Sequence, residues 1–276
     1  MSDYEVEDRI NDSLSFSYFC GMSIDQVAPD HSTISRFRTL MTQKGAYEEL
    51  FRSINAQLEA HGIIVKTGAL VDSSIVDTPL KPKGSSRYEV LDQDKQEDAI
   101  VDQPVEVKKD IAPSVDTEEA WVKKAGKLRY GYKKYHLTDD EGMIMGLLTT
   151  PANVNEISNL EEVLDTVNLP EGTTLKADKG YQSQKNSEIL QRRKLKNHIM
   201  KKAKRNKTLT PWEKKFNNLI GKTRFNVERS FGSINRWFSG GVARYRGLEK
   251  MHTQNLMEAI CHNLYLSPGI IASNGV

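Results

Sequence analysis

The sequence lacks the features that mark secreted, disulfide-stabilised and membrane proteins. It has only two cysteines, Cys20 and Cys261, whose wide separation fits neither a zinc motif nor a redox pair. It contains no run of about eighteen apolar residues, as a membrane-spanning helix would require. Its first residues are acidic and unlike a signal peptide. We therefore expect a cytoplasmic protein with two free thiols and no membrane association.

The chain also has little net charge, but its charges are unevenly distributed. The formal net charge is +2, yet residues 81–120 carry more acids than bases and residues 191–250 are strongly basic. With 38% hydrophobic and 28% charged residues, the composition is that of an ordinary soluble protein with one large or two small domains. We therefore predict a solvated acidic segment and a surface suited to a polyanion.

Residues 1–62 are predicted to be helical, without strand signals. Within them, a Pro-Asp turn is followed by Ser32 or Thr33 as a helix cap and then by Arg36 and Arg38, as in the recognition helix of a helix-turn-helix. A small packing helix with surface arginines is an equally good interpretation. The apolar residues at helical spacing are Val6, Ile10, Leu14, Leu50, Phe51, Ile54 and Leu58.

The first predicted strand carries two acidic residues. Residues 68–79 are rich in β-branched side chains and end at a proline. Alternation places Asp72 and Asp77 on opposite faces. The most apolar part of the segment directly precedes Asp72, so we expect Asp72 to be the more buried carboxylate and the better metal ligand, and Asp77 to be solvated.

The segment 80–126 has no periodicity and many acidic residues. We expect a long exposed loop, with Trp121 anchoring its end to the body of the protein. Mobile acids beside a basic groove would compete with DNA, but a solvating linker is the simpler interpretation.

The chain beyond this loop is predicted to alternate between strands and helices. Such an order is typical of a mixed sheet with helices on its faces, in which the first strand and the strand ending at Asp178 are neighbours. The predicted elements are a hairpin of residues 128–137 and 143–150, a helix 155–168, the Asp178 strand, a helix 183–194 and a strand 197–200.

Residues 173–238 carry the strongest chemical signals. The strand at their start ends in Asp178, and an apolar stripe at helical spacing near their end places Arg224 and Glu228 beside a core, where a carboxylate needs a cation. The basic tract between the two acids would repel itself unless it bound a polyanion. Acids flanking such a tract suggest divalent-metal chemistry on a phosphodiester.

Four ordered motifs make the chain resemble a known family. They are Val71-Asp72-Ser-Ser-Ile-Val76, Gly131-Tyr-Lys-Lys-Tyr-His136, Ala177-Asp178-Lys-Gly-Tyr181 and Arg224-Phe-Asn-Val-Glu228-Arg-Ser-Phe-Gly232. Over essentially the whole chain, the sequence resembles the DDE transposases of bacterial insertion sequences, specifically the insertion-sequence-five group of the insertion-sequence-four-like superfamily.

This resemblance implies an α/β fold with a ribonuclease-H-like mixed sheet flanked by helices. It implies Asp72, Asp178 and Glu228 as the catalytic, metal-binding triad, with Mg²⁺ as the cofactor and Mn²⁺ as its substitute. We expect two domains. These are a helical, helix-turn-helix-like region for DNA binding and dimerisation at 1–62, and a catalytic domain at 63–276 with the acidic loop 80–126 and a basic insertion at about 192–222.

The implied function is that of a transposase acting on double-stranded DNA. It would bind terminal inverted repeats, cleave DNA and join the freed 3′-end to target DNA as a homodimer, at the nucleoid of a bacterial cytoplasm. Two alternatives are a metal-dependent nuclease of the same fold and a DNA-binding regulator without activity.

The sequence departs from the family pattern around its last acid. Gly221 and Asn235 stand where the superfamily signature has Tyr and Lys, so Arg229 or Arg236 are candidate replacements for phosphate contacts. Relatives usually have a further helix ahead of the part seen here, so we expect a shortened N-terminus. Packing is the alternative role for His136, Tyr181 and Trp212. The residues expected to contact DNA are Arg36, Arg38, Lys133, His136, Lys179, Lys201, Lys202, Lys204, Arg205, Lys207, Trp212, Arg224, Arg229 and Arg236.

Overall fold

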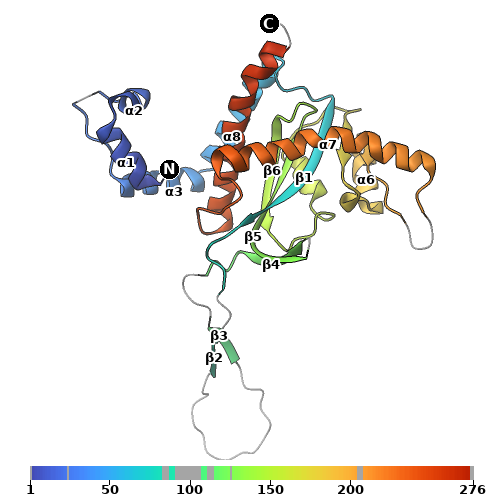
Figure 1. The fold of residues 1–276 in the computed structure, drawn as a ribbon, viewed down its shortest axis with the longest axis horizontal. Helices are drawn as coiled ribbons and strands as arrows, with labels where there is room; N and C mark the ends of the chain where they lie inside the picture. The colour runs from blue at the N-terminus through green and yellow to red at the C-terminus, as the bar shows by residue number, and fades with distance from the viewer. Residues whose placement is uncertain are drawn as a thin grey trace, which may run out of the picture.

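A six-stranded mixed sheet forms the centre of the computed structural model (Figure 1). The structure describes residues 2–23, 25–82, 87–90, 107–110, 115–124, 126–203 and 208–273. The sheet has the order β4-β5-β1-β7-β8, and β6 also pairs with β5. Its strands are β1 (Gly68–Asp77), β4 (Ala120–Lys124), β5 (Lys127–Thr138), β6 (Ile144–Pro151), β7 (Thr174–Ala177) and β8 (Lys196–Ile199).

Strand β1 lies at the middle of the sheet, between an antiparallel and a parallel neighbour. It pairs antiparallel with β5, so that Asp72 lies opposite His136, and parallel with β7, so that Val71 lies opposite Ala177. The predicted pairing of the first strand with the Asp178 strand is therefore confirmed. Because the two strands run in parallel, Asp178 follows the end of β7 close to Asp72.

Helices cover both faces of this sheet. On the face of Val71 and Tyr135, α5 (Leu160–Asp165) and α6 (Gln184–Arg192) complete the largest core cluster. On the other face, α7 (Pro211–Phe238) crosses the sheet next to α8 (Leu248–Ser273), as Figure 1 shows. The chain thus has the predicted α/β architecture, with a mixed sheet between helices.

Four helices precede the sheet, as the periodicity predicts. They are α1 (Asp3–Asp12), α2 (Leu14–Phe19), α3 (His31–Gln43) and α4 (Ala46–Ala60). The cap of α3 differs from the prediction. It is Asp30, whose side chain accepts from the Thr33 amide at 2.8 Å, because the carboxylate directly precedes the first helical turn and Ser32 and Thr33 already lie inside it.

The structure corrects three predicted elements. The described part of the segment 80–126 is not only loop, because β4 pairs with β5 there and β2 (Arg87–Val90) pairs with β3 (Val107–Asp110) away from the sheet (Figure 1). The predicted helix 155–168 shortens to α5. Helix α7 begins at Pro211, after a Thr210 capping box, so the last part of the predicted basic insertion, from residue 211, belongs to this helix.

The described residues bear on two expectations from composition, which concern the cysteines and membrane-spanning helices. Cys20 and Cys261 are both free thiols, as predicted. Within the described part of the chain, no helix is long and apolar enough to cross a membrane.

Candidate active site

Three separate elements bring the predicted acidic residues together. Asp72 lies within β1, Asp178 follows β7 and caps a short 3₁₀ turn (Lys179–Tyr181), and Glu228 lies on α7. The apolar stripe of α7 fixes this arrangement, since Val227 and Phe231 pack on Leu70, two residues before Asp72. The side chain of Asp72 is 16% exposed and that of Asp77 is 46% exposed, so Asp72 is the more buried acid, as expected.

Arg224 lies where the three carboxylates converge. Its guanidinium is 2.8 Å from Asp72 Oδ2, 3.4 Å from Asp178 Oδ1 and 3.2 Å from Glu228 Oε1. Burial lowers the pKa of Arg224, but the three carboxylates outweigh it, so its pKa is raised overall. Glu228 is 57% exposed and not buried beside the core as expected, and the cation that pairs with it lies one helical turn earlier on the same helix.

The same three carboxylates are chemically suited to a divalent metal. As the side chains stand, the described residues contain no group of three acidic, His or Cys side chains placed to hold a metal ion. The carboxylates instead share the positive charge of Arg224. Carboxylate oxygens are the donors that hard divalent cations prefer, so the chemistry of these side chains is compatible with such an ion in place of the guanidinium.

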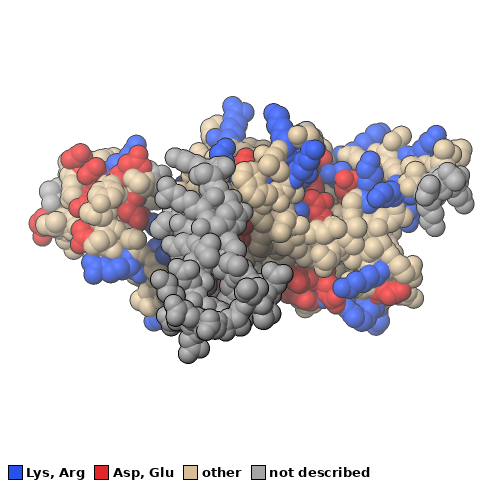
Figure 2. Space-filling model, turned by 90° about the horizontal axis from the view of Figure 1, so that it is seen from below, with Lys and Arg blue, Asp and Glu red and all other residues tan. Residues whose placement is uncertain are grey.

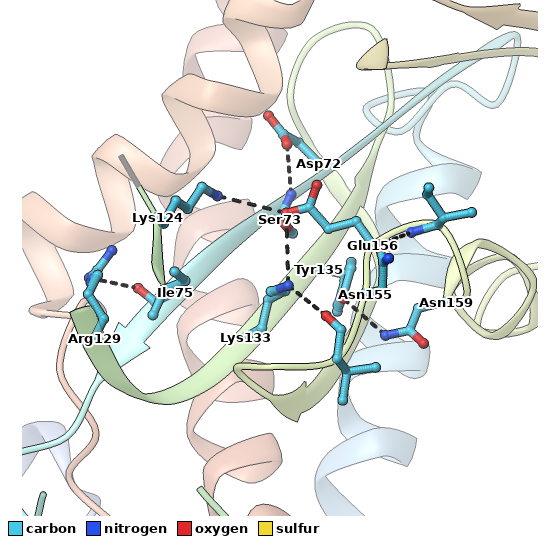
Figure 3. A network of polar contacts seen from close by, with 12 residues as sticks. Asp72, Ser73, Ile75, Lys124, Arg129, Lys133, Tyr135, Asn155, Glu156 and Asn159 are labelled. Carbon is cyan, nitrogen blue, oxygen red and sulfur yellow. Dashed lines mark hydrogen bonds and ion pairs between the residues drawn. The ribbon is translucent and has the colours of Figure 1, made fainter. Parts of the chain in front are cut away.

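A second group of polar residues lies on the opposite face of β1, and none of the sequence motifs singled it out. Glu156, in the loop after β6, accepts a hydrogen bond from the Ser73 hydroxyl at 2.7 Å, and Lys124 and Lys133 lie near its carboxylate (Figure 3). No motif spacing marks Glu156. Glu156 fell at the start of the predicted helix 155–168, and its place shortly after the predicted hairpin is the one signal that could have found it.

Three residues considered for DNA contact are buried. His136 is fully buried, stacks on Phe231 with ring centroids 4.1 Å apart and hydrogen-bonds Ser230. Lys133 is 6% exposed and donates to the Val154 carbonyl. Both side chains point into packed layers, so neither His136 nor Lys133 is accessible in this structure for the expected contact with DNA. Tyr181 is also fully buried, which favours packing over base stacking.

Arg38 is engaged within the protein. It pairs with Asp3 on α1, and its guanidinium lies 5.2 Å from the centre of the Tyr245 ring. This contact fits a packing helix better than a recognition helix. Figure 2 also shows many acidic side chains on the face of the N-terminal helices at the left of that view. A surface that binds DNA needs Lys and Arg side chains instead.

The other expected DNA contacts are placed as follows. Arg36, Lys179, Lys202, Arg229 and Arg236 are exposed, as is Trp212, which stacks on Phe216 with centroids 5.2 Å apart. Lys201 is partly buried, with its ammonium 5.7 Å from the centre of the Phe216 ring. Lys204, Arg205 and Lys207 lie outside the described residues.

Comparisons with known proteins agree on one family. Residues 65–264 match the "Transposase DDE domain" family, and residues 1–40 match "Transposase domain (DUF772)". The chain is 37% identical over 231 residues to the transposase for insertion sequence element IS1106 of Neisseria meningitidis serogroup B, covering 83% of this chain and 75% of that protein. No solved structure gave a significant match.

These matches also bear on the fold and the chemistry. The DDE domain is ribonuclease-H-like, in agreement with the observed mixed sheet, and it implies dependence on a divalent metal. DNA is the material on which transposases act. With its domain matches and its relative, the chain belongs to the DDE transposases of bacterial insertion sequences and is an enzyme of that class.

Proposed function

We propose that this transposase binds the terminal inverted repeats of its element, cleaves DNA there and joins the freed 3′-end to target DNA. The observation that carries the proposal is the convergence of Asp72, Asp178 and Glu228 on one cation, Arg224. Three carboxylates, one within β1, one just after β7 and one on α7, share a positive charge, and such a set of oxygen donors suits metal-dependent phosphoryl transfer.

We assign a separate role in this reaction to the three acids and to Arg224. Asp72, Asp178 and Glu228 hold the metals, and Mg²⁺ fits their oxygen donors, with Mn²⁺ as a substitute. Two such ions, when bound there, would supply the activation of water or a 3′-hydroxyl and the stabilisation of the departing oxygen. Arg224, once released from the acids, has a free planar guanidinium that pairs with a backbone phosphate of the DNA.

The exposed basic residues of α7 and its surroundings supply the DNA surface. Arg229 and Arg236 lie on the same helix as Glu228, and Lys179 follows Asp178 directly. Phosphates held by these residues bring the scissile bond to the triad. Trp212 exposes 64% of its surface at the start of α7 and offers a platform for a base.

The reaction also favours two copies of the chain. Each copy offers one triad, and two element ends must be processed together, so we propose a two-fold dimer on paired ends. Exposed apolar residues of the N-terminal helices and of α8 are the surfaces that we assign to it.

Substitution of the acids tests the triad. Asp178→Asn and Glu228→Gln should each abolish Mg²⁺-dependent nicking and joining of a labelled inverted-repeat end, because a metal ligand is lost. Binding of the same end should stay within about threefold, since it depends on the basic surface.

Asp77→Asn is the matched control on the same strand as Asp72. Asp77 pairs with Arg129 at 2.8 Å on the other side of β1, away from the triad, so this variant should cleave normally. Normal cleavage by Asp178→Asn, or loss of cleavage only in Asp77→Asn, would show that the ligand set is wrong.

A further inference from the structure

Glu156 reaches the active site from the opposite face of the sheet. Its Oε1 accepts the Ser73 hydroxyl at 2.7 Å, and the Ser73 backbone amide donates to Asp72 Oδ1 at 2.8 Å. Ser73 directly follows Asp72 in β1, so the two side chains point to opposite faces. Figure 3 shows Asp72, Ser73 and Glu156 joined in this order. One residue therefore separates Glu156 from the Asp72 carboxylate.

The same carboxylate lies against the turn that follows Asp178. A Cβ atom added to Gly180 would lie 3.3 Å from Glu156 Oε2, so the carboxylate is packed against the backbone of this turn. Gly180 is part of the short 3₁₀ turn that Asp178 caps. Glu156 thus contacts Ser73, which follows Asp72 within β1, and the turn that follows Asp178 after β7.

Two lysines fix the loop that presents Glu156. Lys133 on β5 is buried, donates to the Val154 carbonyl at 2.7 Å and lies 4.0 Å from Glu156 Oε1. Lys124 on β4 lies 3.8 Å from the same oxygen. Their charges offset the cost of holding a carboxylate that is only 27% exposed. The position of Glu156 is therefore set by contacts from β4 and β5, without any contact to the triad acids themselves.

We propose that Glu156 is a positioning residue, which orients Asp72 through Ser73 and sets the place of Asp178 through the Gly180 turn. The inference rests on the proposed function, in which Asp72 and Asp178 hold the metals. Hydrogen-bonded supports of metal-ligating carboxylates typically contribute about 10–100-fold to metal affinity or activity. A support on the far side of β1 leaves the metal side of Asp72 open to DNA.

Binding of Mn²⁺ alone to the full chain, measured without DNA from the electron paramagnetic resonance signal of free Mn²⁺, tests the inference. Glu156→Ala and Ser73→Ala should each weaken binding about tenfold or more. The double variant should bind no more weakly than either single variant, because both remove one hydrogen bond. Glu156→Gln should bind within about threefold of the original chain, since its amide oxygen still accepts the Ser73 hydroxyl.

The reference variants separate this inference from the triad itself. Asp72→Asn should remove the Mn²⁺ site, and Glu161→Ala, which loses a surface contact with Arg192 on the neighbouring helix, should change nothing. If Glu156→Ala and Ser73→Ala keep the original Mn²⁺ affinity while Asp72→Asn loses it, the positioning role of Glu156 is wrong. The assignment of Asp72 to the metal-binding triad is then still supported. Unchanged affinity in Asp72→Asn overturns the triad and this inference with it.

Two further results complete the test. If Glu156→Gln is as damaging as Glu156→Ala, the hydrogen bond to Ser73 is not the means of support and the inference is wrong. If circular dichroism shows that Glu156→Ala does not fold, Ser73→Ala alone decides, because it removes a single hydroxyl and should reproduce the tenfold loss.

Discussion

At the scale of single residues, Arg224 is the side chain on which the site depends. It is 18% exposed and makes ion pairs with all three carboxylates, one of which, Glu228, lies one turn further along α7. Without this cation, the three negatively charged carboxylates would face one another without a neutralising partner. A metal ion held by these acids, as proposed above, would compete with Arg224 for them.

Arg224→Gln should destabilise the folded protein and strengthen metal binding. We expect a loss on the order of 2 kcal/mol at low salt, less than for a fully buried pair because Glu228 is half-exposed. Added Mn²⁺ should restore the loss. Urea unfolding at low and high salt, with and without Mn²⁺, measures both effects. Arg229→Gln, on the exposed side of α7, is the control, and equal stability of the two variants would contradict a role for Arg224 in neutralising the triad.

At the scale of elements, the segment before β4 ties the edge of the sheet to the start of α8. Asp116 accepts hydrogen bonds from the Tyr132 hydroxyl and the Gly247 amide, both at 2.7 Å, and Glu118 accepts one from the Leu248 amide. Glu119, next in the chain, is 6% exposed. Burial, with a smaller contribution from Asp116, raises the pKa of Glu119 to about 7.

This raised pKa predicts a pH dependence of stability. The folded state favours protonated Glu119, so its contribution is fully present below the ordinary pKa of 4.5 and is lost as the pH rises through about 7. Glu119→Gln should therefore stabilise the protein on the order of 2–3 kcal/mol at pH ~8 relative to its effect at pH ~4. Urea unfolding of both proteins at the two pH values measures this difference. Equal effects of Glu119→Gln at the two pH values would contradict a raised pKa for Glu119.

Helix α7 gives a second prediction at this scale. Its first turns expose Lys214 and Lys215, and Figure 2 shows basic side chains projecting along the outer edge of the molecule. Replacing both lysines with Gln should weaken binding to any DNA sequence and reduce the slope of log affinity against log salt by about 0.9 for each lost phosphate contact. Lys44→Gln, at the end of α3, is the matched surface control. If the slope of log affinity against log salt is the same as for the original chain, the first turns of α7 do not contact DNA.

At the scale of the whole molecule, the N-terminal helices leave apolar surface without a partner in the described chain. Tyr18 and Phe19 on α2 are 85% and 84% exposed, and Leu14 is 67% exposed. Figure 1 shows these helices set to one side of the sheet. Exposed apolar clusters of this kind mark contact surfaces, and the paired-end reaction makes a second copy the occupant that we propose.

Tyr18→Ser together with Phe19→Ser should therefore shift the protein toward monomers. Light scattering with and without inverted-repeat DNA measures the mass, and joining of both ends should fall while single-end nicking is retained. Leu219→Ser, an exposed apolar residue on α7, is the control and should keep the dimer. A monomeric original chain that still joins paired ends would exclude the proposed assembly.

The sequence by itself determined the elements that carry the acids. Alternation and β-branched residues predicted β1, the turn at Gly142 predicted the β5–β6 hairpin, and the stripe of Val227, Phe231 and Ile234 predicted the helix of Glu228. These signals are local, because side-chain periodicity reports the repeat of one strand or helix. The resemblance of the motifs around these elements to the DDE transposases then predicted Asp72, Asp178 and Glu228 as a set.

Only the tertiary structure decided what each side chain faces. The pairing of Arg224 with Asp72 joins residues 152 positions apart, and the contact of Glu156 with Ser73 joins residues 83 apart. The burial of His136 and Lys133, both in a basic and aromatic strand, likewise follows from the helix and loop packed on each face of β5. Such contacts depend on how elements stack, and a periodic pattern contains no information about which element arrives on which face.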